Sequence, residues 1–304
     1  MKWKDPSSYS MINDLIVSFI HSFRMQIFFV VSGFFGAMLF YERTPSAMIK
    51  NRLSRIVYPF LVFVVLLWPF VAFTWTYTGF VLTGSLDAMS ETMAIVGTPL
   101  IIIPLKTFHL WFLYYLALIL GVTILLAFAV KKVPKFTRAI SSSFNWIFQK
   151  PILRVFFFAG LTALVFLIMG VSRVATSSSW IPEIPTFIYY FFFFNVGWIL
   201  FKFKHLLCSF NRLDWASFGM GVVVLSLCFI NRQTISYEMQ LIANSFIVWL
   251  FVFGITGLFI RYGSGYSARM RYIILCLFAS LACCSFHLCF YFSFGFVLFL
   301  IHIF

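Results

Sequence analysis

Charged side chains are scarce in this chain. Only 10% of its 304 residues are Asp, Glu, Lys or Arg, whereas 62% are hydrophobic. Soluble globular domains carry roughly a quarter charged residues and about half apolar ones. The composition therefore excludes an ordinary soluble domain and predicts a polytopic membrane protein.

Acidic residues are the rarest of the charged types. The chain has 8 of them against 22 Lys and Arg, which gives a formal net charge of +14. A nucleic-acid partner would be one explanation for a strongly basic protein. Here the basic residues fall in short loops between apolar runs, where they set the orientation of membrane spans. We therefore expect membrane lipid, and no nucleic acid, around these charges.

The sequence also lacks a cysteine framework and a cleavable leader. Of six cysteines, Cys208 and Cys228 are isolated, and the other four lie within the apolar stretch 276–289 without ligand-like neighbours. We expect no metal and interpret the cysteines as small hydrophobic residues. Residues 1–14 are polar and include two aspartates, which does not resemble a cationic, cleavable signal peptide.

Apolar runs of about twenty residues recur along the chain, long enough to cross a hydrocarbon core about 30 Å thick. We predict an all-α, polytopic transmembrane helix bundle of about eight spans. The expected helices cover residues 15–40, 56–79, 107–130, 152–174, 185–203, 214–231, 238–260 and 273–303. The apolar stretch 94–105 is too short to span and contains two prolines, so we expect a re-entrant or surface-lying segment.

The distribution of Lys and Arg orients these spans. Loops 41–55, 131–154, 202–213 and 261–272 hold four, six, three and three of them, sixteen of the 22 in the chain. The alternate loops and the N-terminal part share the remaining six. By the positive-inside rule we place the four basic loops in the cytoplasm, which puts both termini on the outer side.

Both ends of the chain depart from this regular pattern. An outer N-terminus without a signal sequence predicts one further helix upstream of the first one here. Residues 274–304 contain four of the six cysteines and no Lys, Arg, Asp or Glu. Two interpretations of this tail stay open: an ordinary lipid-facing last helix, or translation in a shifted frame.

Arg24 is the first candidate for chemistry, since a cation inside an apolar run is costly unless it has a task. His21 is three residues earlier and shares its helix face. The run 15–40 would be about 39 Å long, longer than the bilayer core. Arg24 therefore either snorkels to lipid headgroups or faces the bundle interior, where it would orient an anionic acyl group or stabilise charge on a carbonyl oxygen.

Arg52 and Arg55 are also three residues apart, at the start of the second expected helix. Two guanidinium groups on one face suit a polyphosphate such as the nucleotide part of coenzyme A. The alternative is simple anchoring at the basic membrane surface.

His109 stands at the outer start of the third expected helix, beside Lys106. An imidazole there is suited to accept a proton from a sugar hydroxyl; the alternative is a residue at headgroup level beside Trp111. Ser32-Gly33 favours a close packing site between helices.

Several short sequence motifs, in their order and spacing, resemble motifs of the acyltransferase-3 family of integral membrane enzymes, and within it those of the glucans biosynthesis protein C group. The likeness runs from about residue 21 to 273 of a chain that we treat as a single membrane-embedded domain, 1–304. The motifs are His21-Ser22-Phe23-Arg24-Met25, Ser32-Gly33-Phe34-Phe35, Arg52-Leu53-Ser54-Arg55 and His109-Leu110-Trp111-Phe112-Leu113.

The resemblance implies a ten-helix bundle of the bacterial inner membrane that moves an acyl group from cytoplasmic acyl-CoA to a hydroxyl of an extracytoplasmic glycan. In the glucan group the acyl group is typically succinyl and the acceptor a periplasmic glucan. The resemblance assigns Arg52 and Arg55 to the family's Arg-x-x-Arg motif, which would bind the acyl-CoA. It assigns Arg24 to the family's Phe-Arg-Met motif and His109 to its His-Leu-Trp-Phe-Leu motif, and both are catalytic candidates.

The chain departs from the family pattern at both ends. The resemblance places the family's principal catalytic histidine in a first helix, ahead of the segment that begins here at about residue 15. After Ile273, the polar stretch usual in the family is replaced by the apolar residues 274–277. We therefore expect a truncated acyltransferase that is inactive on its own. A non-catalytic partner of a glycan assembly complex and a secondary transporter are the alternatives, although no internal repeat supports the transporter.

Overall fold

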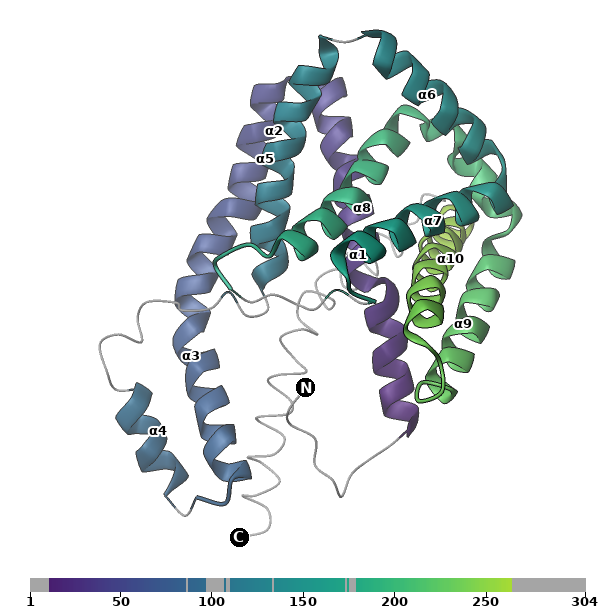
Figure 1. Ribbon diagram of the computed structural model, residues 1–304. Helices are drawn as coiled ribbons and strands as arrows, with labels where there is room; N and C mark the ends of the chain where they lie inside the picture. Colours follow the sequence, from purple (N-terminus) through teal and green to yellow (C-terminus); the bar gives the residue numbers. More distant parts are fainter. Residues whose placement is uncertain are drawn as a thin grey trace. The chain divides into compact units, whose positions relative to one another are not determined.

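The computed structural model describes residues 11–85, 87–96, 107, 110–132, 134–172, 174 and 179–263, and within them it is all-helical (Figure 1). The long helices fit the prediction of a polytopic bundle. The elements are α1 (Met11–Glu42), α2 (Pro45–Arg52), the π-helix η2 (Leu53–Val57), α3 (Tyr58–Leu82), α4 (Ala88–Val96), α5 (Trp111–Lys131), α6 (Pro134–Gln149), α7 (Pro151–Met169), α8 (Ile184–Lys202), the 3₁₀ helix η5 (Lys204–Arg212), α9 (Asp214–Ile230) and α10 (Tyr237–Gly263).

Six of the described helices are long and apolar enough to cross a membrane. The bent pair η5 and α9, which meet at 65°, gives a seventh if it is counted as one span. These seven correspond to the first seven expected helices. The eighth, 273–303, lies outside the described residues. Large apolar side chains such as Ile168, 77% exposed, point away from the protein interior, as lipid-facing residues do.

The predicted end of one helix was wrong. We expected a helix over 152–174, but α7 ends at Met169. Gly170 adopts a left-handed conformation with φ of 63°, and its N–H and that of Val171 bond back to the carbonyls of Leu167 and Phe166. This closing pattern favours glycine, which has no Cβ to clash in that conformation, and it ends the helix.

The basic loop 131–154 between two expected spans contains helix α6, which is not among the helices long and apolar enough to cross a membrane. Phe144, Ile147 and Phe148 follow the spacing of one helix face, and the last two are buried. Packing against α7 and η5 therefore orders a segment that hydropathy alone treats as a linker. In the apolar stretch 94–105, only the first three residues are described, and they belong to α4.

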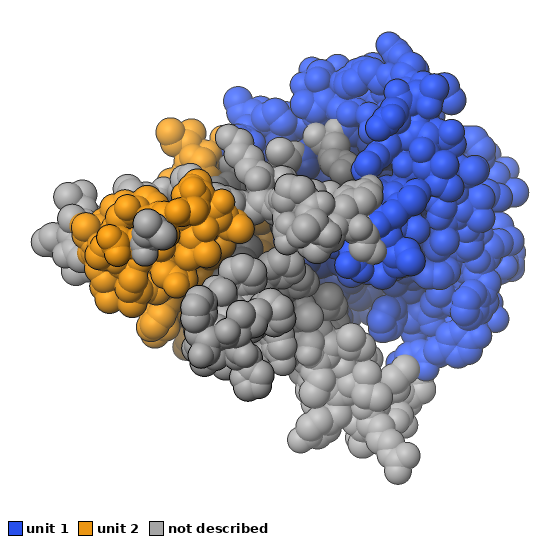
Figure 2. Space-filling model, turned by 90° about the horizontal axis from the view of Figure 1, so that it is seen from below, with its two compact units in different colours: residues 1–48, 118–175, 183–265 blue, residues 49–117, 176–182, 266–304 orange. Residues whose placement is uncertain are grey.

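The chain forms two compact units, shown separately in Figure 2. Unit 1 comprises residues 1–48, 118–175 and 183–265, and unit 2 comprises 49–117, 176–182 and 266–304. The sequence motifs that resemble the family are divided between the two units. The expectation of a single domain over 1–304 remains a prediction.

The crossing of α1 and α8 is the closest helix contact in unit 1. A Cβ on Gly33 would overlap the carbonyl of Phe194, and one on Gly197 would overlap the carbonyl of Val30. Glycine at both positions lets the two backbones touch, as in membrane helix pairs built on small residues. The close packing predicted at Ser32-Gly33 is confirmed.

Aromatic side chains fill the interior of unit 1. Trp249 of α10 is fully buried and stacks on Phe158 of α7 and Phe193 of α8, with ring centroids 4.7 and 4.9 Å away. Its indole N–H donates to Oγ1 of Thr162 at 2.7 Å. The hydrogen bond gives the polar end of this large side chain a partner where no water is at hand.

Candidate functional site

The predicted site residues belong to different parts of the structure. Arg24 lies in unit 1, Arg52 and Arg55 lie in unit 2, and His109 falls outside the described residues. Their proposed roles therefore stay predictions, and each described residue is considered in its own surroundings.

Arg24 is half-buried on α1, about 27 Å along the helix from Glu42 at its other end. On one side, Phe19 and Phe23 contact Phe251 of α10, with ring centroids 5.2 and 5.4 Å away. His21 is exposed, and its ring Nδ1 lies 2.8 Å from the carbonyl of Val17. Arg24 is therefore a half-buried cation that directly follows, in the sequence, a residue of the aromatic cluster around Phe251.

Gln26, two residues further along α1, is a buried polar residue that the sequence interpretation did not single out. Its Nε2 donates to the hydroxyl of Tyr189 on α8 at 3.1 Å, and its Oε1 is buried without a partner among the described residues. The signal was available, since an amide inside an apolar run is a common helix-packing group.

Arg52 and Arg55 flank the junction between α2 and α3. The π-helix η2 starts directly after Arg52 and contains Arg55, and such insertions occur often at functional sites. Arg55 is exposed. The Nε and Nη2 atoms of Arg52 are buried and have no hydrogen-bond partner among the described residues. Arg52 thus keeps donors of its planar guanidinium available to an oxyanion.

At the start of α5, the described part of the motif His109-Leu110-Trp111-Phe112-Leu113 is Leu110 to Leu113. Trp111 is buried and makes an edge-to-face contact with Tyr115, with ring centroids 5.8 Å apart. This burial favours a packing role for the indole over one at a lipid or sugar surface.

Two buried charged groups of unit 1 were not singled out by the sequence interpretation, which counted Arg154 only as a loop cation and did not consider Asp214. Asp214, at the start of α9, is 2% exposed and pairs with Arg261 of α10. Arg154, in the first turn of α7, is 1% exposed. No pattern in the sequence marks them as buried, because the apolar runs end within a few residues of both.

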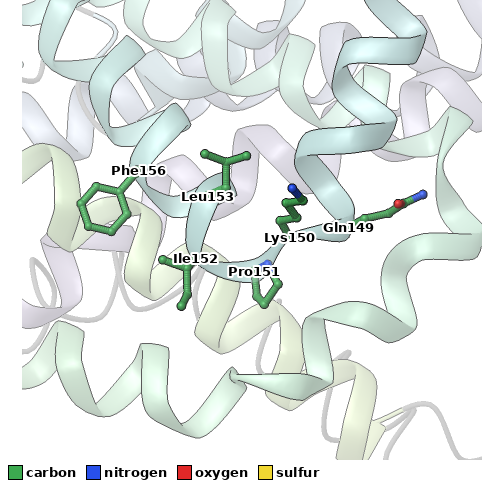
Figure 3. Close-up of a pocket in the computed structure, with 6 residues that line it drawn as sticks. All are labelled: Gln149, Lys150, Pro151, Ile152, Leu153 and Phe156. Atoms are coloured by element: carbon green, nitrogen blue, oxygen red, sulfur yellow. The ribbon is translucent and has the colours of Figure 1, made fainter.

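Among the described residues, no group of three or more His, Cys, Asp or Glu is arranged to hold a metal ion. An open hollow of about 430 Å³ lies at the corner of α6 and α7 (Figure 3). Its lining is Gln149, Lys150, Pro151, Ile152, Leu153 and Phe156. This mostly apolar hollow includes none of the predicted site residues.

Comparison with known proteins gives a family but not a substrate. The acyltransferase-domain family matches residues 3–231, which is most of the chain. Glucans biosynthesis protein C from Escherichia coli O1:K1 / APEC, O139:H28 (strain E24377A / ETEC) and strain K12 / DH10B is 47% identical over 53 residues in each case.

That likeness covers 17% of this chain and 14% of each relative. No solved structure matches the chain. The breadth of the family match and the six helices long and apolar enough to cross a membrane lead to one conclusion: the chain is a multi-pass membrane protein that belongs to the acyltransferase-3 family.

Proposed function

We propose that this protein is a membrane O-acyltransferase that moves an acyl group, of succinyl or acetyl type, from cytoplasmic acyl-CoA to a hydroxyl of an extracytoplasmic glycan. Membership of the acyltransferase-3 family supports the reaction class. The partial likeness to glucans biosynthesis protein C supports a periplasmic glucan as acceptor. In this proposal the four basic loops face the cytoplasm of a bacterium and the protein lies in its inner membrane.

The observation that carries the donor part of the proposal is the environment of Arg52. Two of its guanidinium nitrogens are buried without an acceptor among the described residues, next to a π-helix that carries Arg55. A phosphate of coenzyme A would supply the missing acceptors in charge-assisted hydrogen bonds, which are about twice as strong as neutral ones. Arg55, exposed close by in the sequence, would bind a second phosphate.

In the proposed reaction, the acceptor hydroxyl oxygen attacks the thioester carbonyl of the acyl donor. The C–O bond forms, the C–S bond breaks, and the proton passes through a base to the released thiolate of coenzyme A. His109 is our candidate for the base. Arg24 would stabilise the negative charge that develops on the carbonyl oxygen.

Donor binding and acyl transfer are best measured separately, with the purified 1–304 chain in lipid nanodiscs. We expect acyl-CoA to bind, and Arg52→Met to weaken binding at least about tenfold, the equivalent of one lost charge-assisted contact. Lys132→Met, which removes an exposed cation from a different basic loop, is the matched control and should bind normally. Equal binding by the Arg52→Met variant and the wild type would contradict the donor site.

Transfer of a labelled acyl group to glucan is the second measurement. Transfer above that of an Arg24→Ala variant would establish the reaction and would contradict the expectation that this chain is inactive on its own. Absence of acyl-CoA binding, together with co-purification of a glycan synthase, would instead support a non-catalytic partner. Substrate-dependent flux into liposomes would support a transporter.

A further inference from the structure

Arg154 is a buried cation without a counter-charge among the described residues. It lies in the first turn of α7, is 1% exposed, and its Nε and Nη1 atoms are fully buried with no hydrogen-bond partner among the described residues. Guanidinium groups carry five N–H donors and remain charged in proteins. A charge in this position within a membrane protein points to a function by default.

Aromatic rings surround this guanidinium. Its central carbon lies 4.0 Å from the ring centroid of Phe210 on η5 and 4.8 Å from that of Phe253 on α10. Phe148 of α6 contacts Phe210, Phe158 of α7 contacts Phe253, and the members of each pair of partners, Phe148 with Phe158 and Phe210 with Phe253, also contact each other. The ring centroids are 5.4–6.2 Å apart. We call Phe148, Phe158, Phe210 and Phe253 the Arg154 cage.

The cage compensates the charge only in part. Ring faces attract a cation through their quadrupoles, but they accept no strong hydrogen bond from the edge of a guanidinium. The same unit shows what full compensation requires: Arg261 donates to both carboxylate oxygens of Asp214 and to the carbonyl of Asn211. Arg154 has no such acceptor in the described part of the chain.

One wall of the cage is built from a segment suited to move. Phe210 lies in η5, which holds a 3₁₀ conformation over nine residues. Runs of this helix beyond three or four residues are uncommon, because their hydrogen-bond geometry is poor. A 65° bend separates η5 from α9, and the start of η5 is tied to α1 by an exposed Lys204–Glu42 pair. Its other end is held by Arg261 of α10, which donates to the carbonyl of Asn211. A shift of η5 that breaks this hydrogen bond would uncover Arg154 while α7 and α10 stay in place.

We propose that Arg154 is the centre of an oxyanion-binding site, reached when η5 moves, whose ligand carries a phosphate or carboxylate group. The fork of the guanidinium fits either group with two parallel hydrogen bonds. Arg52 belongs to unit 2, so this is a second candidate anion site with its own surroundings. The hollow in Figure 3 is not this site, because Arg154 is absent from its lining.

The test is thermal unfolding of the full chain in nanodiscs of zwitterionic lipid, titrated with inorganic phosphate or with succinate. A third sample uses discs that contain phosphatidylglycerol, so that an anionic headgroup is distinguished from a soluble anion. At a hundredfold excess over its Kd, a ligand of the native state should raise Tm by about 4 °C. We expect this rise with at least one of the three probes.

Two variants and one control separate binding from a structural role. Arg154→Met should abolish the rise in Tm and leave the unliganded Tm equal or higher, because a charge without acceptors is replaced by an apolar chain of similar length. Arg154→Lys keeps the charge but loses the fork and should bind roughly tenfold more weakly. Arg232→Met removes an exposed arginine that also lies over a ring, that of Phe229 at 5.3 Å, and should respond like wild type.

Three outcomes would overturn the proposal. One is that no probe stabilises the wild type. Another is that Arg154→Met keeps the response. The third is that Arg154→Met folds with a clearly lower unliganded Tm, which would make the cage a structural cation–π anchor. If Arg154→Met does not fold, the affinity of Arg154→Lys decides, and an affinity equal to wild type counts against the site.

Discussion

Asp214 and Arg154 of unit 1 are both almost fully buried, but they differ in whether neighbouring groups complete their hydrogen bonds. Asp214, 2% exposed, is bonded by Nε and Nη2 of Arg261 at 2.5 and 2.9 Å and by the backbone N–H of Trp215 at 2.8 Å. Arg154, 1% exposed, has aromatic rings around it and no acceptor among the described residues.

The difference separates a structural role from a functional one. A buried ion pair whose hydrogen bonds are complete holds its helices together, and removal of one partner leaves a costly charge behind. A buried charge whose hydrogen bonds are missing weakens the fold and is kept only if something else uses it. Gly257 supports the first role, because a Cβ there would lie 2.7 Å from Cβ of Asp214, so α10 approaches this pair closely.

The largest expected effect is on the complete ion pair. Arg261→Met should lower the free energy of unfolding by more than the other changes below, because it leaves the buried Asp214 carboxylate without its cation. Denaturant unfolding in detergent micelles measures this value. Arg212→Met, an exposed arginine of the same region, is the control and should change stability by less than about 0.5 kcal/mol. A similar loss in both variants would break the comparison.

A smaller effect is expected for the neutral version of the same comparison. Thr162→Val leaves the indole N–H of Trp249 buried and unpaired, at an expected cost of about 1–3 kcal/mol. Thr123→Val is matched, since Thr123 is also buried but its Oγ1 has no partner among the described residues. That variant should be neutral or slightly more stable. Thermal unfolding of the two variants measures the two stability changes. Equal losses of stability would show that a threonine with a hydrogen-bond partner matters no more than one without.

The smallest effect concerns an exposed pair. Lys204 and Glu42 join η5 to α1 at 2.7 Å, but both side chains are at least half exposed. Glu42→Gln should cost no more than about 1 kcal/mol, because water and salt screen the attraction. The cost should shrink further in 1 M salt, where the screening length is about 3 Å. A large, salt-independent loss would mean that this pair holds η5 in place as firmly as a buried one.

Much of the fold could be predicted from composition and hydropathy alone. In a bilayer every backbone group must be bonded within the protein, so each apolar run of sufficient length becomes a helix. This argument located the six described helices that are long and apolar enough to cross a membrane, and the bent pair of η5 and α9. The Ser32-Gly33 pair separately identified Gly33 as a close-packing residue. The bilayer argument missed α6, which is ordered by packing of Ile147 and Phe148 and not by hydropathy.

The candidate site was predictable only as a set of residues. Arg24, Arg52 and Arg55 stood out for two reasons: cations near apolar runs are rare, and these three lie in motifs that resemble those of the family. Their roles, and that of His109, remain predictions. The incomplete hydrogen bonding of Arg52 could not be foreseen, since it depends on which neighbours cover the guanidinium.

The sequence by itself determined that this chain is a helical membrane protein with basic loops at alternate crossings, because the bilayer acts on each segment separately. Only the tertiary structure decided which charges are paired. Arg154 and Arg261 both count as loop cations in the sequence, yet one meets phenylalanine rings and the other a carboxylate. The reason is physical: hydropathy is a property of one segment, whereas compensation of a charge depends on side chains that other helices bring to it.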